Sequence, residues 1–387
     1  MAGATAETAD SLELRTPGGW IPLGFVHEPE TIYLVARSRA AQWPIELLRT
    51  GRAEFRLPDR RALGTPRLVS EPGDRGRILD LFREKYGPEK FGRWYDHPAR
   101  VLRVSLSRSE GPTGDGSPSY YAWLEAEFDN VAEDYDHHIT GNRMNRLLRD
   151  HSLAIFRRRF ERCHRLIEIG CGSGMETLPL LEMGHEVLAI DISSRMLATV
   201  RQKAQRAGVS ERLETRQLAA RELPRLVEEG SAGSFDAAYS TYGALNCEPD
   251  LSAIPPSLAK LLVPSAPFVA GVYNRWCLFE LAGYSLSLRP GLGLSRRRNP
   301  VPVGASRFCV DVYAYSAGEF IELFRPQFQL EAVEGVPVFL PPSNLAGYAE
   351  RFSRHFGRLA AWDARLGRLW PFNRLGDHFL MTYARRG

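Results

Sequence analysis

Cysteine and long apolar runs are scarce in this sequence, and each shortage excludes a class of protein. The 387 residues include five widely spaced cysteines with no C-x-x-C pair, namely Cys163, Cys171, Cys247, Cys277 and Cys309. Neither a disulfide framework nor a zinc site is therefore indicated, and a reducing cytoplasm fits best. The longest apolar run, residues 261–273, is interrupted by two prolines and a serine, and residues 1–10 are small and polar. We therefore expect no signal peptide, no membrane span and no membrane partner.

A large excess of charge of one sign is also missing. Lys and Arg total 50 against 46 acidic residues, a net charge of +4, so a nucleic-acid partner is not indicated. The length and the 44% hydrophobic content allow two domains, each with its own core. We expect the partner to be a small-molecule substrate.

Residues 1–107 have the pattern of a small antiparallel β domain with two helices. Apolar runs predict strands at 20–26, 31–36, 53–57, 67–69 and 100–106, and helical patterns cover 40–49 and 74–85. The first two strands are expected to form a hairpin, and the second helix to end at Tyr86-Gly87-Pro88. Residues 108–118 are rich in Gly, Ser and Pro and are predicted to be a linker, which leaves 119–387 as a second domain.

The order of elements in this first domain resembles the split β-barrel of the flavin- and deazaflavin-binding reductases. The resemblance covers roughly residues 18–107 and implies FMN or a deazaflavin, with its phosphate near Arg37, Ser38 and Arg39. Alternatively, these residues are solvated loop charges on a barrel without a cofactor, and the glycine-rich phosphate loop of many deazaflavin binders is absent. A homodimer through this domain is a further expectation.

The stretch Leu166-Ile-Glu-Ile-Gly-Cys-Gly-Ser-Gly174 carries the strongest signal in the chain. A short apolar run followed by three alternate glycines, a helix, a second apolar run and Asp191 are the parts of a nucleoside-binding βαβ unit. The glycines permit a sharp turn and close approach of the backbone to a ligand. A dinucleotide fingerprint would need a glycine where Met175 stands, so the spacing favours another cofactor.

This motif is similar to the first motif of class I S-adenosylmethionine-dependent methyltransferases. In that family the methionine end of the cofactor lies along the loop, here Gly170, Cys171, Gly172 and Gly174, and an acidic group such as Glu168 takes its ammonium. Asp191 would accept from the ribose hydroxyls, and Ile192 and Met196 would flank the adenine. Ser193 is predicted to cap the next helix, with a buried stripe at Met196, Leu197, Val200 and Ala204 and an end at Gly208.

Two further segments fit the same family, and one does not. The segment 128–136 resembles the helix that precedes the core strand, where an aromatic covers the methionine part of the cofactor; Tyr135 is the candidate, or it merely packs the helix onto the core. The third strand is expected at 213–218. A typical member of the family has an Asp shortly after this strand, and this chain has none there. Only Glu222 could replace it, or backbone N–H groups near Ala219 and Ala220 could hold the adenine.

The substrate side is expected beyond the fourth strand, predicted at 235–241. Tyr242 could shield the sulfonium and Asn246 could orient the acceptor, unless this segment is only a turn with an Asn cap. His138, next to His137, could serve as a general base, or both could be idle on a helix end. Residues 275–315 would form a lid over a fairly apolar guest. Arg296 to Arg298 are expected in a solvated loop, the alternative being contact with an acidic substrate.

The second domain is therefore predicted to be α/β, with a Rossmann-like seven-stranded sheet whose last strand is antiparallel. Strands at 267–273, 328–333 and 378–384 complete it, and a helix is expected from Asn344 to Leu366. We expect transfer of a methyl group from S-adenosylmethionine to an oxygen, nitrogen or carbon of a small, fairly apolar molecule. The alternatives are a flavin- or deazaflavin-dependent reductase activity in the first domain, and a non-enzymatic ligand sensor.

Overall fold

The computed structural model describes residues 11–16, 19–28, 31–37, 41–56, 61–95, 100–106, 118–132, 135–286, 293–297, 300–301, 310, 312–345 and 353–387. The chain divides into two compact units, the first made essentially of residues 1–131 and the second of almost all of 132–387. Most of the predicted linker, residues 108–117, falls outside the described residues.

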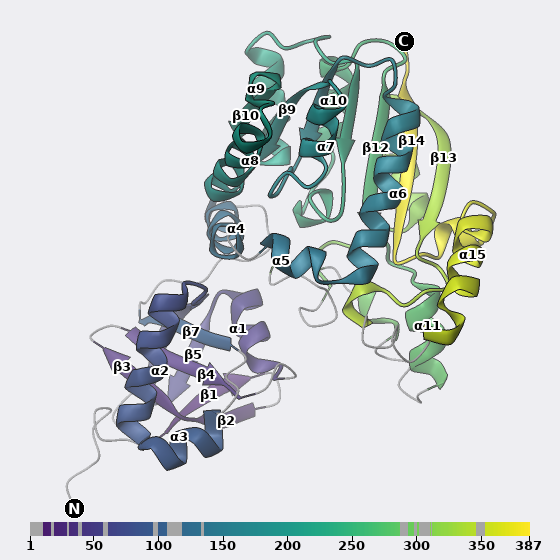
Figure 1. Ribbon diagram of the computed structural model, residues 1–387. Coiled ribbons are helices and arrows are strands. Elements are labelled where there is room, and N and C mark those ends of the chain that lie inside the picture. The colour runs from purple at the N-terminus through teal and green to yellow at the C-terminus, as the bar shows by residue number, and fades with distance from the viewer. Residues whose placement is uncertain are drawn as a thin grey trace, which may run out of the picture. The chain divides into compact units, whose positions relative to one another are not determined.

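The first unit is built on a seven-stranded antiparallel sheet. Its order is β2-β1-β5-β6-β7-β4-β3, with bounds β1 Leu12–Thr16, β2 Gly19–Leu23, β3 Phe25–Glu28, β4 Thr31–Ala36, β5 Ala53–Arg56, β6 Arg61–Leu68 and β7 Arg100–Leu106 (Figure 1). β2 and β3 lie at opposite edges of this sheet although Gly24 alone separates them in the chain. The sheet must therefore curl until its edges meet. At Gly24 a Cβ would lie 2.5 Å from the hydroxyl of Tyr95, which explains the glycine.

This arrangement corrects the prediction in two places. The expected single strand 20–26 is two strands that pair with different partners, β1 and β4. The predicted hairpin with 31–36 is formed by β3 alone, and β1 was not predicted because its charged and apolar residues alternate within a polar lead. The curled antiparallel sheet itself is confirmed, whereas its assignment to the split-barrel family stays a prediction.

The described part of the first unit contains four helices: α1 Trp43–Thr50, α2 Pro72–Tyr86, α3 Pro88–Tyr95 and α4 Pro118–Val131. Leu14 and Phe55 of the sheet form one core with α1. Phe82 and Tyr86 of α2 form a second core with α3 and the sheet. The prediction of two helices missed α3 because Pro88 was taken as the end of a helix. Pro88 instead occupies the first position of a new helix, where its missing N–H costs nothing.

The second unit contains the predicted seven-stranded α/β sheet. Its order is β10-β9-β8-β11-β12-β14-β13, with bounds β8 Arg165–Ile169, β9 Glu186–Asp191, β10 Leu213–Gln217, β11 Ala237–Ser240, β12 Pro267–Tyr273, β13 Phe328–Val336 and β14 His378–Arg385. β14 is antiparallel to both of its neighbours, as predicted for the last strand. Because the remaining strands run in one direction, their carboxyl ends share one edge of the sheet, and His378 at the start of β14 lies there too.

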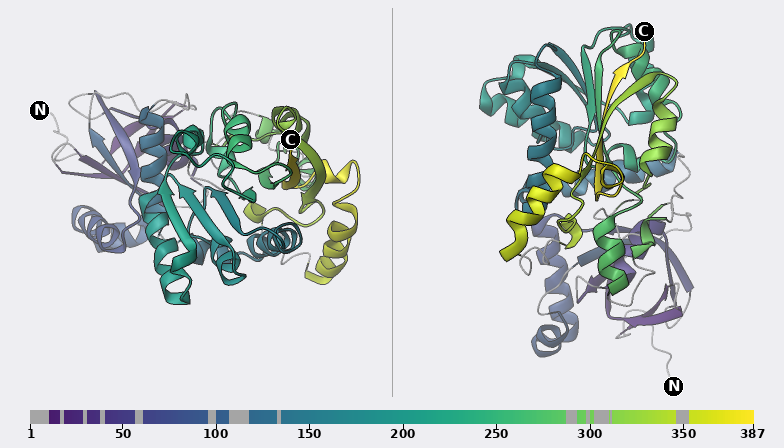
Figure 2. Two further views of the ribbon diagram at one scale, coloured as in Figure 1. Left: turned by 90° about the horizontal axis from the view of Figure 1, so that it is seen from above. Right: turned by 90° about the vertical axis from the view of Figure 1, so that its right-hand side faces the viewer.

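Helices cover both faces of this sheet (Figures 1 and 2). One core joins the sheet to α6 Arg143–Arg159, α7 Thr177–Glu182 and α8 Ser194–Ala207, and the other joins it to α9 Leu223–Glu228, α10 Ile254–Leu261 and α13 Ala317–Phe324. Neighbouring strand residues alternate between the cores; Leu166 enters one and Ile167 the other, as a parallel sheet buried on both faces requires.

In the described part of the second unit there are also α5 Tyr135–Thr140, α11 Leu278–Leu286 and α15 Phe356–Leu366. α15 accounts for the described end of the helix expected within 344–366. Among the described residues, no helix has the length and apolar character needed to span a bilayer.

Candidate functional site

The three glycines of the loop after β8 are required by its backbone. Gly170, Gly172 and Gly174 have φ values of 73°, 52° and 79°, in the left-handed region that favours glycine. Close packing adds a second reason at Gly170, where a Cβ would lie 2.1 Å from the Cβ of Ala244 in the loop after β11. The N–H groups of Gly170 and Cys171 both donate to the carbonyl of Ile190, at 2.8 and 3.0 Å. The loop is thus held against the end of β9.

Asp191, at the end of β9, completes this arrangement. Its Oδ2 accepts from the N–H of Gly172 at 2.8 Å, and its Oδ1 accepts from the N–H of Ser193 at 2.9 Å. Ser193 in turn caps α8 by accepting from the N–H of Met196 at 3.0 Å, as predicted. A carboxylate oxygen can accept more than one hydrogen bond, so Asp191 can hold the loop and still receive hydroxyl donors.

Glu168, the acidic residue before the loop, is buried inside the sheet. Its Oε2 accepts from the hydroxyl of Thr177 and, at 2.9 Å, from that of Tyr239. Burial raises the pKa of Glu168 to about 8. Burial therefore favours the protonated form of this carboxyl.

Tyr135, at the start of α5, lies against the same loop. A Cβ at Gly172 would be 3.7 Å from the ring carbon Cε1 of Tyr135. The next residue fixes the helix, because Asp136 accepts from the hydroxyl of Ser173 and forms an ion pair with Lys203. The Lys203 ammonium also donates to the carbonyl of Ser173 at 2.7 Å. The ring predicted to cover the methionine part of the cofactor is thus tethered beside the loop.

Arg149, in α6, is a site residue that the sequence reasoning missed. It forms an ion pair with the buried Glu176, and its Cζ lies 5.5 Å from the centre of the Tyr242 ring. Asn145 and Ser152 share its helix face at four- and three-residue spacing, and both are buried. Because both are polar, this face of the helix did not stand out as a buried one. An arginine in a buried stripe needs a partner or a ligand.

Of the two residues predicted to flank an adenine, Met196 is buried and Ile192 is half-buried. Ala219 and Glu222, each considered for the adenine, contact one another: the N–H of Ala219 donates to Oε2 of Glu222 at 2.9 Å. The other oxygen of Glu222 accepts from Arg225 at 3.0 Å. Both carboxylate oxygens of Glu222, the residue considered as a replacement for the absent Asp, therefore already accept hydrogen bonds within the chain.

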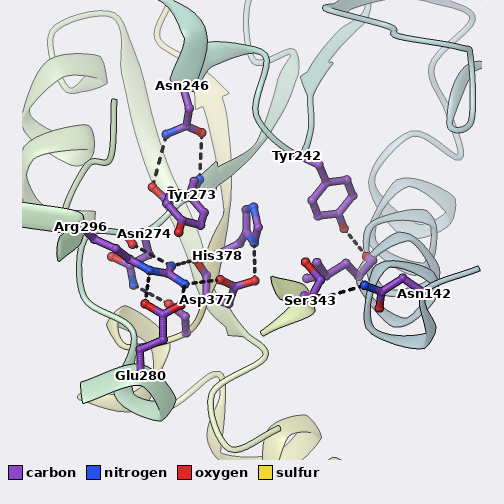
Figure 3. A network of polar contacts seen from close by, with 12 residues as sticks. Asn142, Tyr242, Asn246, Tyr273, Asn274, Glu280, Arg296, Ser343, Asp377 and His378 are labelled. Atoms are coloured by element: carbon purple, nitrogen blue, oxygen red, sulfur yellow. Dashed lines mark hydrogen bonds and ion pairs between the residues drawn. The ribbon is translucent and has the colours of Figure 1, made fainter. Parts of the chain in front are cut away.

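Tyr242 and Asn246, the substrate-side candidates, differ in their surroundings (Figure 3). Tyr242 has a φ of 56°, unusual for a residue with a side chain, and its hydroxyl donates to the carbonyl of Leu148. Asn246 is fully buried: its Oδ1 accepts from the N–H of Tyr273 at 2.9 Å and its Nδ2 donates to the carbonyl of Tyr313 at 2.6 Å. The Asn246 amide therefore joins two distant backbone segments instead of capping a local turn, whereas Tyr242 contacts α6.

His378, at the start of β14, also lies at this edge, whereas the side chain of His138 lies outside the described residues. The His378 ring makes an edge contact with Tyr242, with centroids 5.6 Å apart. Its Nδ1 is 3.2 Å from Oδ2 of Asp377, and Oδ1 of Asp377 accepts from Arg296 at 2.7 Å. Arg296 also donates to Glu280 at 2.6 Å (Figure 3). The expectation of a solvated Arg296 is therefore wrong, because the residue is fully buried between two carboxylates.

In the first unit, Arg37 stands over the Tyr95 ring with its Cζ 5.8 Å from the centroid. Ser38 and Arg39, the other two candidates for a flavin phosphate, lie outside the described residues, so that site stays a prediction. Throughout the described part of the chain, no group of three or more His, Cys, Asp or Glu side chains is placed to hold a metal ion.

Residues 166–265 match the family model described as a methyltransferase domain. This segment contains the glycine loop, Asp191 and the loop after β11. Glycine N-methyltransferases of Mus musculus and Rattus norvegicus are each 30% identical to this chain over 97 residues, which are 25% of the chain. The match spans only 31% of the length of these relatives.

Solved methyltransferases are similar over more of the chain. The 1,6-didemethyltoxoflavin N1-methyltransferase of Burkholderia thailandensis is 19% identical with a TM-score of 0.44, covering 72% of this chain and 94% of that one. A putative S-adenosylmethionine-dependent methyltransferase of Listeria monocytogenes is 16% identical with a TM-score of 0.42, covering 63% of this chain and 99% of that one.

Proposed function

We propose that the second unit transfers a methyl group from S-adenosylmethionine to a small, fairly apolar molecule. The observation that carries this proposal is the joint placement of Asp191, the glycine loop and the Tyr135 ring at one edge of the sheet. In open α/β sheets, ligands bind beyond the carboxyl ends of the strands. The methyltransferase domain match over 166–265 supports the same assignment.

The charges of this edge suit the cofactor. S-adenosylmethionine has a cationic sulfonium and ammonium and one carboxylate. Asp191 would accept from the two ribose hydroxyls, and Glu168 would pair with the ammonium and lose its proton in doing so. Arg149, next to Tyr135 and Tyr242, is placed to receive the cofactor carboxylate in exchange for part of its pairing with Glu176.

The protein's part in the reaction is alignment and exclusion of water. The bound cofactor supplies an electrophilic methyl group, so that the acceptor's electron pair forms the new bond to carbon while the carbon–sulfur pair stays on sulfur. Holding the two reactants in line contributes roughly 7–11 kcal/mol in well-oriented systems. The rings of Tyr135 and Tyr242 would face the sulfonium through cation–π contact and keep water away from it. A base is needed only if the acceptor must lose a proton, and His378, which contacts Tyr242, is a candidate for it.

Calorimetric titration with S-adenosylmethionine tests the binding site. Asp191→Asn is expected to weaken binding at least tenfold. Asp236→Asn is the matched control, because Asp236 also accepts two backbone N–H groups, from His164 and Arg165 at 2.9 and 3.0 Å, but at the opposite edge of the sheet. Equal affinity in wild type and Asp191→Asn would exclude the assigned site. Binding without methyl transfer to any small molecule that co-purifies would favour a sensor over an enzyme.

A further inference from the structure

A separate surface of the second unit gathers exposed aromatic and aliphatic side chains. It is formed by α15 and the segment that follows to Leu375, and we call it the α15 surface (Figure 1). Trp370 is 77% exposed, Trp362 54% and Leu369 53%. Three of the six large apolar side chains that are exposed in the described chain thus fall within nine residues. Exposed apolar groups that gather in one region are candidates for a contact surface.

The orientation of α15 is fixed by its inner face. Phe356 and the neighbouring Leu359 and Ala360 pack in a small core with Met144 and Leu340. On the same helix, the carboxylate of Asp363 accepts from three successive backbone N–H groups, those of residues 338–340, at 2.7 to 3.1 Å. Because this side of the helix is anchored, the opposite side is held toward the surroundings.

The outer face of α15 is cationic. Arg358, Trp362 and Arg365 follow one another at four- and three-residue spacing and so share one face of the helix. Arg354 precedes α15, and Arg374 lies in the segment that follows it. All four arginines are exposed. Within the described residues, none of the four has an ion-pair partner, and Asp363, the one acidic residue between 353 and 375, is already occupied. The surface combines unpaired positive charge with exposed tryptophan.

We propose that the α15 surface binds the interface of an anionic lipid bilayer. Tryptophan prefers the headgroup level of bilayers, and arginines are attracted to anionic headgroups nearby. Burial of Trp362, Leu369 and Trp370 would add apolar area to that attraction. This contact needs no membrane-spanning segment. The expectation of no membrane partner was based on the absence of such a segment, and it did not consider binding to the bilayer surface.

The charge of the surface argues against other occupants. A symmetric contact with a second copy would bring the same unpaired arginines together with no free carboxylate of this surface to meet them. A nucleic acid would satisfy the arginines and could stack on tryptophan, but Leu369 has no π face to offer a base. An anionic bilayer satisfies the cationic and the aliphatic groups together.

Co-sedimentation of the full chain with vesicles tests this proposal. Binding to vesicles of phosphatidylcholine with about one third phosphatidylglycerol is expected to exceed binding to pure phosphatidylcholine at least fivefold, and to weaken as salt screens the charges. Arg358→Gln/Arg365→Gln and Trp370→Ala should each lower binding severalfold. Arg157→Gln/Arg206→Gln is the matched control, since both of these arginines are exposed and form no ion pair among the described residues.

Three results would overturn the proposal. The first is equal binding to the two kinds of vesicle. The second is equal loss in the α15 and control variants, which would indicate a general charge effect. The third is absence of vesicle binding together with evidence for another occupant. That evidence would be a fluorescent oligonucleotide bound through Arg358 and Arg365, or a dimer, seen by sedimentation equilibrium, that Trp370→Ala dissociates. Because the substituted side chains are exposed, a folding defect is not expected, and circular dichroism checks this.

Discussion

Replacing the buried carboxyl of Glu168 should change how the stability of the second unit depends on pH. Glu168 lies in β8, and burial raises its pKa to about 8 from an ordinary value of 4.5. Glu168→Gln keeps an oxygen that can accept from Thr177 and Tyr239, but it cannot ionise. The variant therefore isolates the effect of the charge from the effect of the hydrogen bonds.

The expected magnitude follows from the two pKa values. The difference, 8 minus 4.5, is about 3.5 units, or about 5 kcal/mol at 1.36 kcal/mol per unit. Above pH 4.5 the unfolded chain loses this proton while the folded chain keeps it until about pH 8. The wild-type free energy of unfolding should therefore fall relative to that of the variant by about 1.4 kcal/mol per pH unit in this window. Below the window the contribution of Glu168 is fully present, and above it the loss is complete.

Urea denaturation of both proteins, in steps of about one unit from about pH 5 to about pH 9, measures this difference. Hydrogen exchange in β8 identifies the transition that belongs to the second unit. Parallel profiles for wild type and Glu168→Gln would refute the reasoning, because they would mean that Glu168 titrates alike in the folded and unfolded chain.

The remaining predictions concern other parts of the same unit. Arg296→Met should destabilise it by about 3–5 kcal/mol, because two buried carboxylates lose their partner, whereas the exposed Arg325→Met should cost less than about 1 kcal/mol; urea denaturation compares them. Gly170→Ala should abolish cofactor binding measured by calorimetry through a clash and a positive φ, while Gly184→Ala, which has a positive φ in open space, should not. Tyr135→Leu should weaken binding roughly fivefold in the same assay and Tyr135→Phe should leave it nearly unchanged, since only the ring is needed; equal effects would contradict the cation–π role.

The parts of the fold that local sequence signals determine were predicted well. Ser193 and Gly208 bound α8, and its buried residues are the four that the 3.6-residue period selects. The loop glycines and Asp191 were found because a βαβ unit needs them within one short stretch. The order of the second sheet and its antiparallel last strand were likewise confirmed.

The parts that depend on distant partners were not predicted. Arg296 resembles any loop arginine until Glu280 and Asp377, far from it in sequence, close around it. Arg149 and Glu176 meet in the same way across 27 residues. In the first unit, the split of one apolar run at Gly24 depends on how the whole sheet curls, which no local pattern encodes.

The measurement that tests the central claim most directly is an NMR titration of S-adenosylmethionine labelled with ¹³C at its methyl group. If the sulfonium lies beside the rings of Tyr135 and Tyr242, the methyl signal should move upfield on binding to the wild-type chain and should move less with Asp191→Asn at the same concentration. A methyl signal that keeps its free position and line width at saturating wild-type protein would contradict the account.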